Sequence, residues 1–204
     1  NTPTGATLVC ANTTNISYTV PLLNGATSYL WTAPTGATIA SGQGTNSINV
    51  NFTNSALSGN ICVAASNSCG SSASVSKALT VFDSVPAKPT SISGNIVQCA
   101  GSSGAVFSCP LDVNASSYSW TIPATATLVN GQGTNSITVN FLSTFTSGVI
   151  NVTAVNCKGS SAIKKITIIA KPSKPKLVSG PAEGVCEGTS NVIYTIPSVY
   201  SASS

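Results

Sequence analysis

The 204-residue sequence contains no histidine, no methionine and no arginine, and charged residues make up only 6% of it. Globular proteins usually carry about 25% charged residues. Without histidine the commonest general base is missing, and neither a Ser-His-Asp nor a Cys-His constellation can be built. The few carboxylates are not paired for acid-base work; they are Asp83, Asp112, Glu183 and Glu187. The sequence therefore predicts that the chain is not an enzyme.

The same scarcity argues against bound metals, cofactors, nucleic acid and membrane insertion. A calcium site needs several clustered oxygen ligands, and a zinc site here would need closely spaced cysteines, which are absent. The net charge of +4 comes from lysine alone, without the arginines and interleaved aromatics of a nucleic-acid surface. No apolar run approaches the roughly 20 residues that span a bilayer. We therefore expect no cofactor, no metal, no nucleic-acid partner and no membrane insertion.

What the sequence does contain favours strands and an oxidising compartment. Valine, isoleucine and threonine abound, and these residues fit a pleated sheet better than a helix. Seven cysteines suit an extracellular location, where disulfides persist. We expect an all-β, extracellular chain.

The chain repeats itself at a spacing of 89 residues. Of the 25 positions in 28–52, 17 are identical in 117–141, and the run Gly-Gln-Gly-Thr-Asn-Ser-Ile recurs unchanged. Such repetition is typical of modular arrays. We predict repeat 1 over 1–84, repeat 2 over 85–171 and the incomplete start of a third over 172–204, and we expect the chain to be part of a longer polypeptide.

Each complete repeat has the pattern of a sandwich of short strands. In repeat 2, alternation and turn residues predict strands over 90–93, 105–109, 117–122, 127–129, 136–141, 149–155 and 162–169. Seven strands in about 90 residues, with a tryptophan on the third, are typical of an immunoglobulin-like sandwich. The fold class predicted is therefore all-β, with tandem immunoglobulin-like sandwich modules.

Three features have both a structural and a functional interpretation. Trp31 and Trp120 could stack on a sugar, but their place two residues after a tyrosine favours core packing. The repeated Gly-Gln-Gly-Thr-Asn segment could bind a glycan through its amides, but its glycines and asparagine also suit a tight turn. The proline-containing linkers, 85–89 and 171–175, favour semi-rigid spacing of the modules.

Three motifs resemble the PKD-like, immunoglobulin-like repeats of Bacteroidota surface proteins. They are Ser28-Tyr-x-Trp-Thr-x-Pro34, Gly42-Gln-Gly-Thr-Asn-Ser-Ile48 and Asn67-x-Cys-Gly70, and the resemblance covers essentially the whole chain. It implies a non-catalytic stalk of a very large adhesin at the bacterial cell surface, of the kind that the type IX secretion system exports in gliding bacteria. The partners expected are neighbouring repeats of the same chain, surface glycans or other cell-surface proteins. The alternative is a carbohydrate-binding accessory module of a secreted polysaccharide-degrading enzyme.

The family relationship, with the repeated cysteines, implies one disulfide in each module: Cys10–Cys69 and Cys99–Cys157. Cys62 and Cys109 are then free, Cys109 packing as a small buried hydrophobe, and Cys186 lacks a partner. In an ordinary sandwich, however, the two cysteines of a module would lie at opposite ends, whereas bonded Cα atoms lie within about 7 Å. We favour the pairing within modules and keep open the alternative in which Cys10 reaches Cys157.

One modification site follows from the resemblance. Bacteria that carry such repeats attach O-glycans to a serine or threonine that follows aspartate and precedes a small or apolar residue. Asp83-Ser84-Val85 is the segment of this chain that matches. We therefore expect either an O-glycan on Ser84 or an unmodified linker serine.

Overall fold

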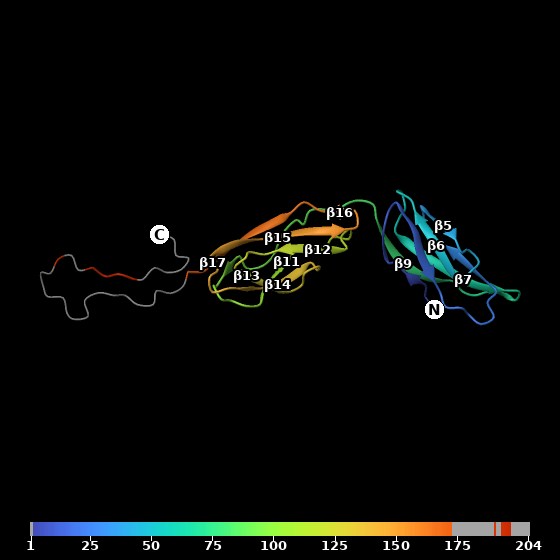
Figure 1. Cartoon of the computed structure of the whole chain (residues 1–204), viewed down its shortest axis with the longest axis horizontal. Coiled ribbons are helices and arrows are strands. Elements are labelled where there is room, and N and C mark those ends of the chain that lie inside the picture. The colour runs from blue at the N-terminus through green and yellow to red at the C-terminus, as the bar shows by residue number, and fades with distance from the viewer. Residues whose placement is uncertain (1, 173–189, 191–192, 197–204) are drawn as a thin grey trace. The chain divides into compact units, whose positions relative to one another are not determined.

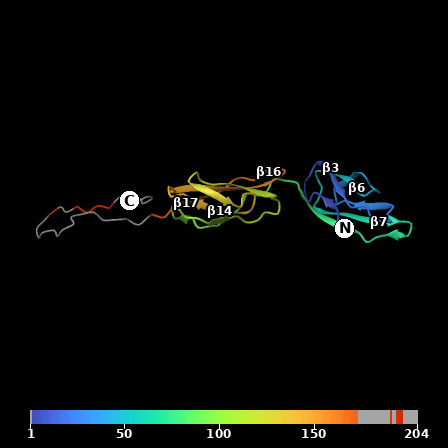
Figure 2. The same cartoon turned by 60° about the horizontal axis from the view of Figure 1, so that its bottom comes forward.

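The computed structural model describes residues 2–172, 190 and 193–196, and among these residues every regular element is a strand (Figures 1 and 2). The chain divides into two compact units. Unit 1 contains Asn1–Ala87 together with two short segments of repeat 2, Asp112–Ser116 and Ala154–Ser161. Unit 2 contains Lys88–Leu111, Ser117–Thr153 and the described residues from Ala162 onward.

Repeat 1 folds into a sandwich of two sheets. One sheet contains, in hydrogen-bonded order, β1 (Thr4–Gly5), β3 (Thr13–Thr19), β6 (Ser47–Phe52) and β5 (Ala37–Ser41). The other contains β2 (Leu8–Cys10), β9 (Val75–Phe82), β7 (Gly59–Asn67) and β4 (Ser28–Thr32), with β8 (Gly70–Ser71) paired to β7. All pairs are antiparallel except β2 with β9, which is parallel.

Repeat 2 forms the same two sheets with one strand fewer. The first contains β11 (Ala105–Ser108), β14 (Ser136–Phe141) and β13 (Ala126–Asn130). The second contains β10 (Val97–Gln98), β17 (Lys164–Ala170), β15 (Ser147–Asn156) and β12 (Ser117–Thr121), with β16 (Gly159–Ser160) paired to β15. The counterpart of β1 is reduced to an isolated bridge between Ser93 and Ser108.

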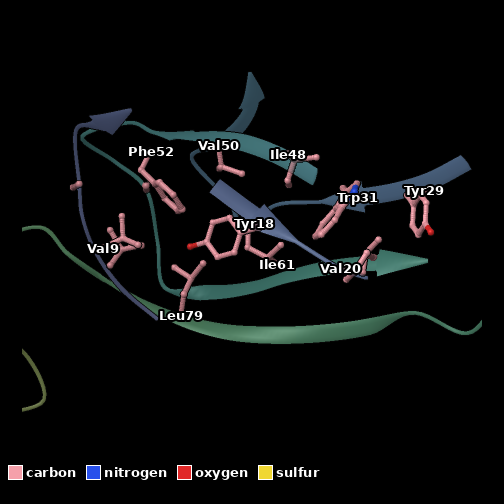
Figure 3. Packing of buried hydrophobic residues seen from close by; sticks show 14 residues of the cluster. Val9, Tyr18, Val20, Tyr29, Trp31, Ile48, Val50, Phe52, Ile61 and Leu79 are labelled. Carbon is pink, nitrogen blue, oxygen red and sulfur yellow. The ribbon is translucent and has the colours of Figure 1, made fainter. Parts of the chain in front are cut away.

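The core of the first sandwich lies between its two sheets. Figure 3 shows Tyr18, Val50 and Phe52 from one sheet and Trp31 and Ile61 from the other pointing into the same space. Each of these side chains is at most 2% exposed. Burying such a side chain stabilises a fold by about 1.5–3 kcal/mol, so this alternating pattern supplies much of the driving force for the sandwich.

Most of the strands expected in repeat 2 are present. The segment 136–141 forms β14 with the predicted bounds, and Ile137, Val139 and Phe141 are buried as the alternation predicts. The strand expected over 90–93 is absent; the first edge strand is β10, whose two residues pair with Ile169 and Ala170. β10 was not predicted because alternation cannot be detected over two residues. Of the segment 90–93, Ser93 alone pairs, in the isolated bridge to Ser108.

The all-β fold class with tandem immunoglobulin-like sandwiches is confirmed. The module boundaries 1–84 and 85–171 remain predictions. The partial third repeat, 172–204, lies almost entirely outside the described residues.

Candidate functional site at the Cys10–Cys157 disulfide

The two tryptophans belong to the core, as predicted. Trp31 is 1% exposed and Trp120 is 4% exposed. Each indole Nε1–H donates to the backbone carbonyl of a threonine in the repeated turn, Thr45 or Thr134, at 2.8 Å in both sandwiches. A buried indole needs such an acceptor, and here the protein supplies it. Neither ring offers a face for stacking on a ligand.

The glutamine of the repeated turn completes the edge of a sheet. Gln43 accepts a hydrogen bond from Trp31 N at 3.1 Å and donates one to Trp31 O at 3.0 Å. Gln132 makes the same pair of bonds to Trp120, both at 3.2 Å. Since β4 and β12 are edge strands, the amide takes the place of a neighbouring strand and covers groups that would otherwise template pairing with another chain.

The remaining residues of the turn are also engaged within the fold. Gly42 and Gly131 have φ of 87° and 90°, and a Cβ on either would collide with the carbonyl of Ser47 or Ser136. Asn46 donates to Val20 O, and Asn135 donates to Cys109 O, both at 3.0 Å. Because each amide has an internal partner, the exact recurrence of this run follows from turn geometry.

The disulfide of the structure joins Cys10 of repeat 1 to Cys157 of repeat 2, with Cα atoms 6.1 Å apart. The favoured pairing, Cys10–Cys69 and Cys99–Cys157, is therefore wrong, and the alternative is the one observed. Cys69 and Cys99 are exposed and carry no disulfide to any described residue.

The length of β7 explains why the pairing within repeat 1 fails. Cys10 pairs with Phe82, the last residue of β9. Phe82 lies three residues beyond Leu79, which pairs with Gly59, the first residue of β7. Cys69 follows Asn67, the last residue of β7. Nine residues at about 3.3 Å each place these ends roughly 25–30 Å apart, far beyond the reach of a disulfide. Repeat 2 has the same arrangement, so Cys99 and Cys157 are separated in the same way.

Polar contacts within unit 1 surround the disulfide. Lys158, next to Cys157, donates from Nζ to Ala11 O, next to Cys10, at 2.8 Å. Asn156 is 5% exposed and donates through Nδ2 to Ser84 O and to Asn114 O, both at 2.8 Å. Its Oδ1 accepts a bond from Lys158 N at 2.8 Å, so this one amide orders the turn that carries Cys157.

The loop Asp112–Ser116 adds a second set of contacts to the segment 84–87. Asp112 accepts a bond from Ala87 N at 2.8 Å. Asn114 donates through Nδ2 to Ser84 O at 3.2 Å and to Val85 O at 3.3 Å. Sequence reasoning missed these residues; the available signal was Asp112, one of only two carboxylates in the first 171 residues.

Ser84, the expected glycosylation site, is exposed at this place. Its hydroxyl donates to Asp83 Oδ1 at 2.9 Å and lies 3.2 Å from Asn114 Nδ2, which donates to it. Its carbonyl accepts the two asparagine bonds described above. Both the backbone and the hydroxyl of Ser84 are thus hydrogen-bonded, although the residue is exposed.

The other described cysteines agree with the predictions made for them. Cys109 is 4% exposed and packs in the core, and burial raises the pKa of its thiol above the ordinary value. Cys62 and Cys109 carry no disulfide to any described residue. Cys186 lies outside the described residues.

The described residues hold no group of three or more His, Cys, Asp or Glu side chains that could bind a metal. The same part of the chain has no helix long and apolar enough to cross a membrane.

Comparison with known families identifies the modules. The model of the PKD-like domain family matches residues 1–81 and again residues 85–168. The chain belongs to the PKD-like domain family. Domains of this kind are generally non-catalytic, and they are often extracellular, with which the disulfide agrees. No curated protein matches the chain.

Similar solved structures are tandem immunoglobulin or fibronectin modules. A chimeric titin Z1Z2 carrying a KLER peptide from decorin is 13% identical, with TM-score 0.37, over 83% of this chain and 96% of that one. Murine CEACAM1b is 11% identical, with TM-score 0.37, over 83% and 98%. Fibronectin(III)-like modules of Clostridium thermocellum CbhA are 17% identical, with TM-score 0.38, over 83% and 94%. These values are too low to indicate a ligand or partner for this chain.

Proposed function

We propose that the chain is a non-catalytic stalk segment of a large secreted adhesin at the bacterial cell surface. The motif resemblance to Bacteroidota repeats supports type IX secretion and a role in gliding motility. The family match supports an adhesion-type structural module. The partners proposed are neighbouring repeats of the same chain, with surface glycans or other cell-surface proteins bound elsewhere in the adhesin.

The observation that carries the proposal is the disulfide between Cys10 and Cys157. A stalk must transmit load without lengthening. Because Cys10 and Cys157 are 147 positions apart in sequence, a pull along the chain passes directly from one to the other. The residues between them carry no tension, although they contain most of both sandwiches. At about 3.4 Å per extended residue, the disulfide prevents the segment between Cys10 and Cys157 from extending by up to about 500 Å.

Single-molecule stretching between the chain termini tests this. In the oxidised chain, only the short segments outside the disulfide should extend. In the reduced chain, the segment between Cys10 and Cys157 should also extend, in two unfolding events. Cys157→Ser should behave like the reduced chain, and Cys69→Ser should behave like the oxidised one. Release of the full length by the oxidised chain would contradict the proposal.

A glycan array separates the stalk from the carbohydrate-binding alternative. Trp31 and Trp120 are buried, and the amides of Gln43 and Gln132 are bonded to the backbone. The residues that suggested sugar binding are thus engaged inside the fold, and we expect no selective glycan binding by the oxidised chain. Selective binding at micromolar concentration would support the accessory-module alternative.

O-glycosylation of Ser84 belongs to the same proposal, since Ser84 is an exposed residue. Intact mass of material from the native host should show hexose increments on the peptide containing Ser84. Their loss in Ser84→Ala, with no other peptide affected, would assign the site. An unmodified peptide would leave an ordinary linker serine.

A further inference from the structure

The two linkers share a pattern that semi-rigid spacing does not explain. Every lysine in them is followed directly by proline, in the pairs Lys88-Pro89, Lys171-Pro172 and Lys174-Pro175. Outside the linkers no lysine precedes a proline; these lysines are Lys77, Lys158, Lys164, Lys165 and Lys176. The sequence contains no arginine. The bond after each basic residue of a linker is therefore a bond to proline.

A linker between domains is where a protease ordinarily cuts, because exposed connections are preferred sites of nicking. In the first linker, Ala87 and Lys88 are exposed, whereas Pro86 and Pro89 are buried. The Lys88 side chain is thus available to an enzyme that binds a cation next to the bond that it cuts.

The residue after lysine decides whether such an enzyme can act. Proteases of the trypsin class hold lysine or arginine against an aspartate in the S1 pocket, and their catalytic histidine then gives a proton to the leaving amine. When the leaving nitrogen belongs to proline, it carries a ring with fixed φ in place of a hydrogen. The ring occupies space that the histidine needs, so the bond is not cut. The Lys88–Pro89 bond is thus protected although the lysine is exposed.

Three other lysines are protected by the sheets. Lys77 lies in β9, and Lys164 and Lys165 lie in β17. At these residues β9 is paired with β7, and β17 is paired with β15. A protease needs its substrate as a separate extended segment, so these bonds become available only when the sheet opens.

Lys158 lies in a turn, but its ammonium group is engaged. Nζ donates to Ala11 O at 2.8 Å, and the backbone N donates to Asn156 Oδ1 at 2.8 Å. An S1 pocket could take this side chain only after the first of these bonds is broken. Each lysine among residues 2–172 is therefore followed by proline, paired within a sheet or bonded through its ammonium group.

We propose that the folded chain resists proteases that cut after lysine or arginine, and that Pro89 and Pro172 are the residues that protect the linkers. The inference goes beyond the proposed stalk function, because it names a class of enzyme that the linkers exclude. The resistance is specific to that class. Leu22 and Leu111 are 79% and 77% exposed, and neither precedes proline, so enzymes with an apolar S1 pocket retain sites.

Limited digestion of the oxidised full chain, followed by mass analysis after reduction, tests the proposal. Trypsin should leave the segment 2–172 whole, whereas chymotrypsin should cut it after Leu22 and Leu111. Trypsin should cut the variant Pro89→Ala after Lys88. Because Cys10 and Cys157 lie on opposite sides of that bond in the sequence, the two products should separate only after reduction.

A second variant leaves the buried proline in place. Ala87→Lys puts a basic residue at an exposed position before Lys88, and trypsin should cut it between positions 87 and 88. Ala87→Gln is the matched control and should stay whole. A metalloprotease that cuts on the amino side of lysine should cut the unaltered chain between Ala87 and Lys88, because proline does not then follow the scissile bond.

Two results would overturn the proposal. One is cleavage of the unaltered, folded chain by trypsin after any lysine of the segment 2–170. The other is survival of both Pro89→Ala and Ala87→Lys under trypsin, because something other than proline would then protect the linker.

Discussion

The two sandwiches share one frame but differ at the end where the β7–β8 and β15–β16 turns lie. In both, the repeated turn supplies the indole acceptor and the glutamine that closes an edge strand. At the turn end, repeat 1 has Gly25, Ser68 and Cys69 where repeat 2 has Asn114, Cys157 and Lys158. The turn residues that hold the tryptophan strand are thus repeated, and the residues that surround the disulfide are not.

The cores differ in a compensating way. Tyr18 of repeat 1 stands where repeat 2 has Phe107, and Ala56 stands where repeat 2 has Phe145. In the second sandwich the Phe141 and Phe145 ring centroids lie 4.4 Å apart, and those of Phe107 and Phe141 lie 6.4 Å apart edge to face. In the first, the Tyr18 hydroxyl instead donates to Ala6 O at 3.0 Å. The second core thus contains an additional aromatic ring, and the first contains a tyrosine whose hydroxyl makes a partly buried hydrogen bond.

The largest expected effect contrasts the two turn cysteines. Cys157→Ser should lower the free energy of unfolding by up to about 5 kcal/mol, the chain-entropy value for a loop of this length. Cys69→Ser should change it by less than about 0.5 kcal/mol, as an exposed substitution away from special features usually does. Urea denaturation of the oxidised proteins measures both. Equal losses of unfolding free energy in the two variants would mean that Cys157 contributes no more to stability than the unbonded Cys69.

A glycine pair sharpens the claim that the repeated turn is a structural element. Gly131→Ala should destabilise by about 3 kcal/mol or more, because strain from positive φ adds to a collision with Ser136 O. Gly133→Ala is the matched control: φ is also 90°, yet nothing lies within 4 Å of the added Cβ. It should cost only about 1 kcal/mol. Thermal denaturation distinguishes the two variants. Similar losses of stability would show that the collision with Ser136 O does not contribute.

The turn asparagines provide a smaller contrast. Asn156→Ala removes a buried amide that holds Ser84 O and Asn114 O, and should cost about 2 kcal/mol. Asn67→Ala removes an exposed amide bonded to Gly25 O and should cost about 1 kcal/mol or less. Hydrogen exchange of the Lys158 and Cys69 amides checks each turn directly. A larger loss at Asn67 would reverse the comparison.

The smallest effect concerns alkaline pH and the difference between Tyr18 and Phe107. Burial raises the pKa of Tyr18 to about 12 from an ordinary value of 10.0. The neutral phenol is thus favoured in the folded state, so its contribution is complete below pH 10 and is lost as the pH rises from 10 to 12. Tyr18→Phe should remove that part of the alkaline loss. Denaturation midpoints at pH 8 and pH 11 measure it, and an unchanged difference between these midpoints would exclude Tyr18 as the cause.

Sequence reasoning succeeded where the pattern was local. The alternation in 136–141 and the tyrosine-tryptophan spacing at Trp31 and Trp120 predicted strands and core, because the pleat fixes which side chains share a face. It failed for β10, which is too short to alternate. The Asn156 contacts were also missed, because the residues that accept its bonds lie up to 72 positions away.

The disulfide error has a particular origin. The prediction treated Cys69 and Cys157 as equivalent residues because each lies near the end of its repeat. The 89-residue offset instead makes Ser68 the equivalent of Cys157. The stated objection, that Cys10 and Cys69 lie at opposite ends of a sandwich, was the decisive physical argument. The partner of Cys10 could not be read from the repeat itself because it lies 147 positions away.

Peptide mapping of the oxidised chain without reductant tests the central claim most directly. The account predicts one linked peptide that joins Cys10 to Cys157, with Cys69 and Cys99 recovered as free thiols in monomeric protein. A peptide that joins Cys10 to Cys69 would contradict it, because the load path through both repeats would then not exist.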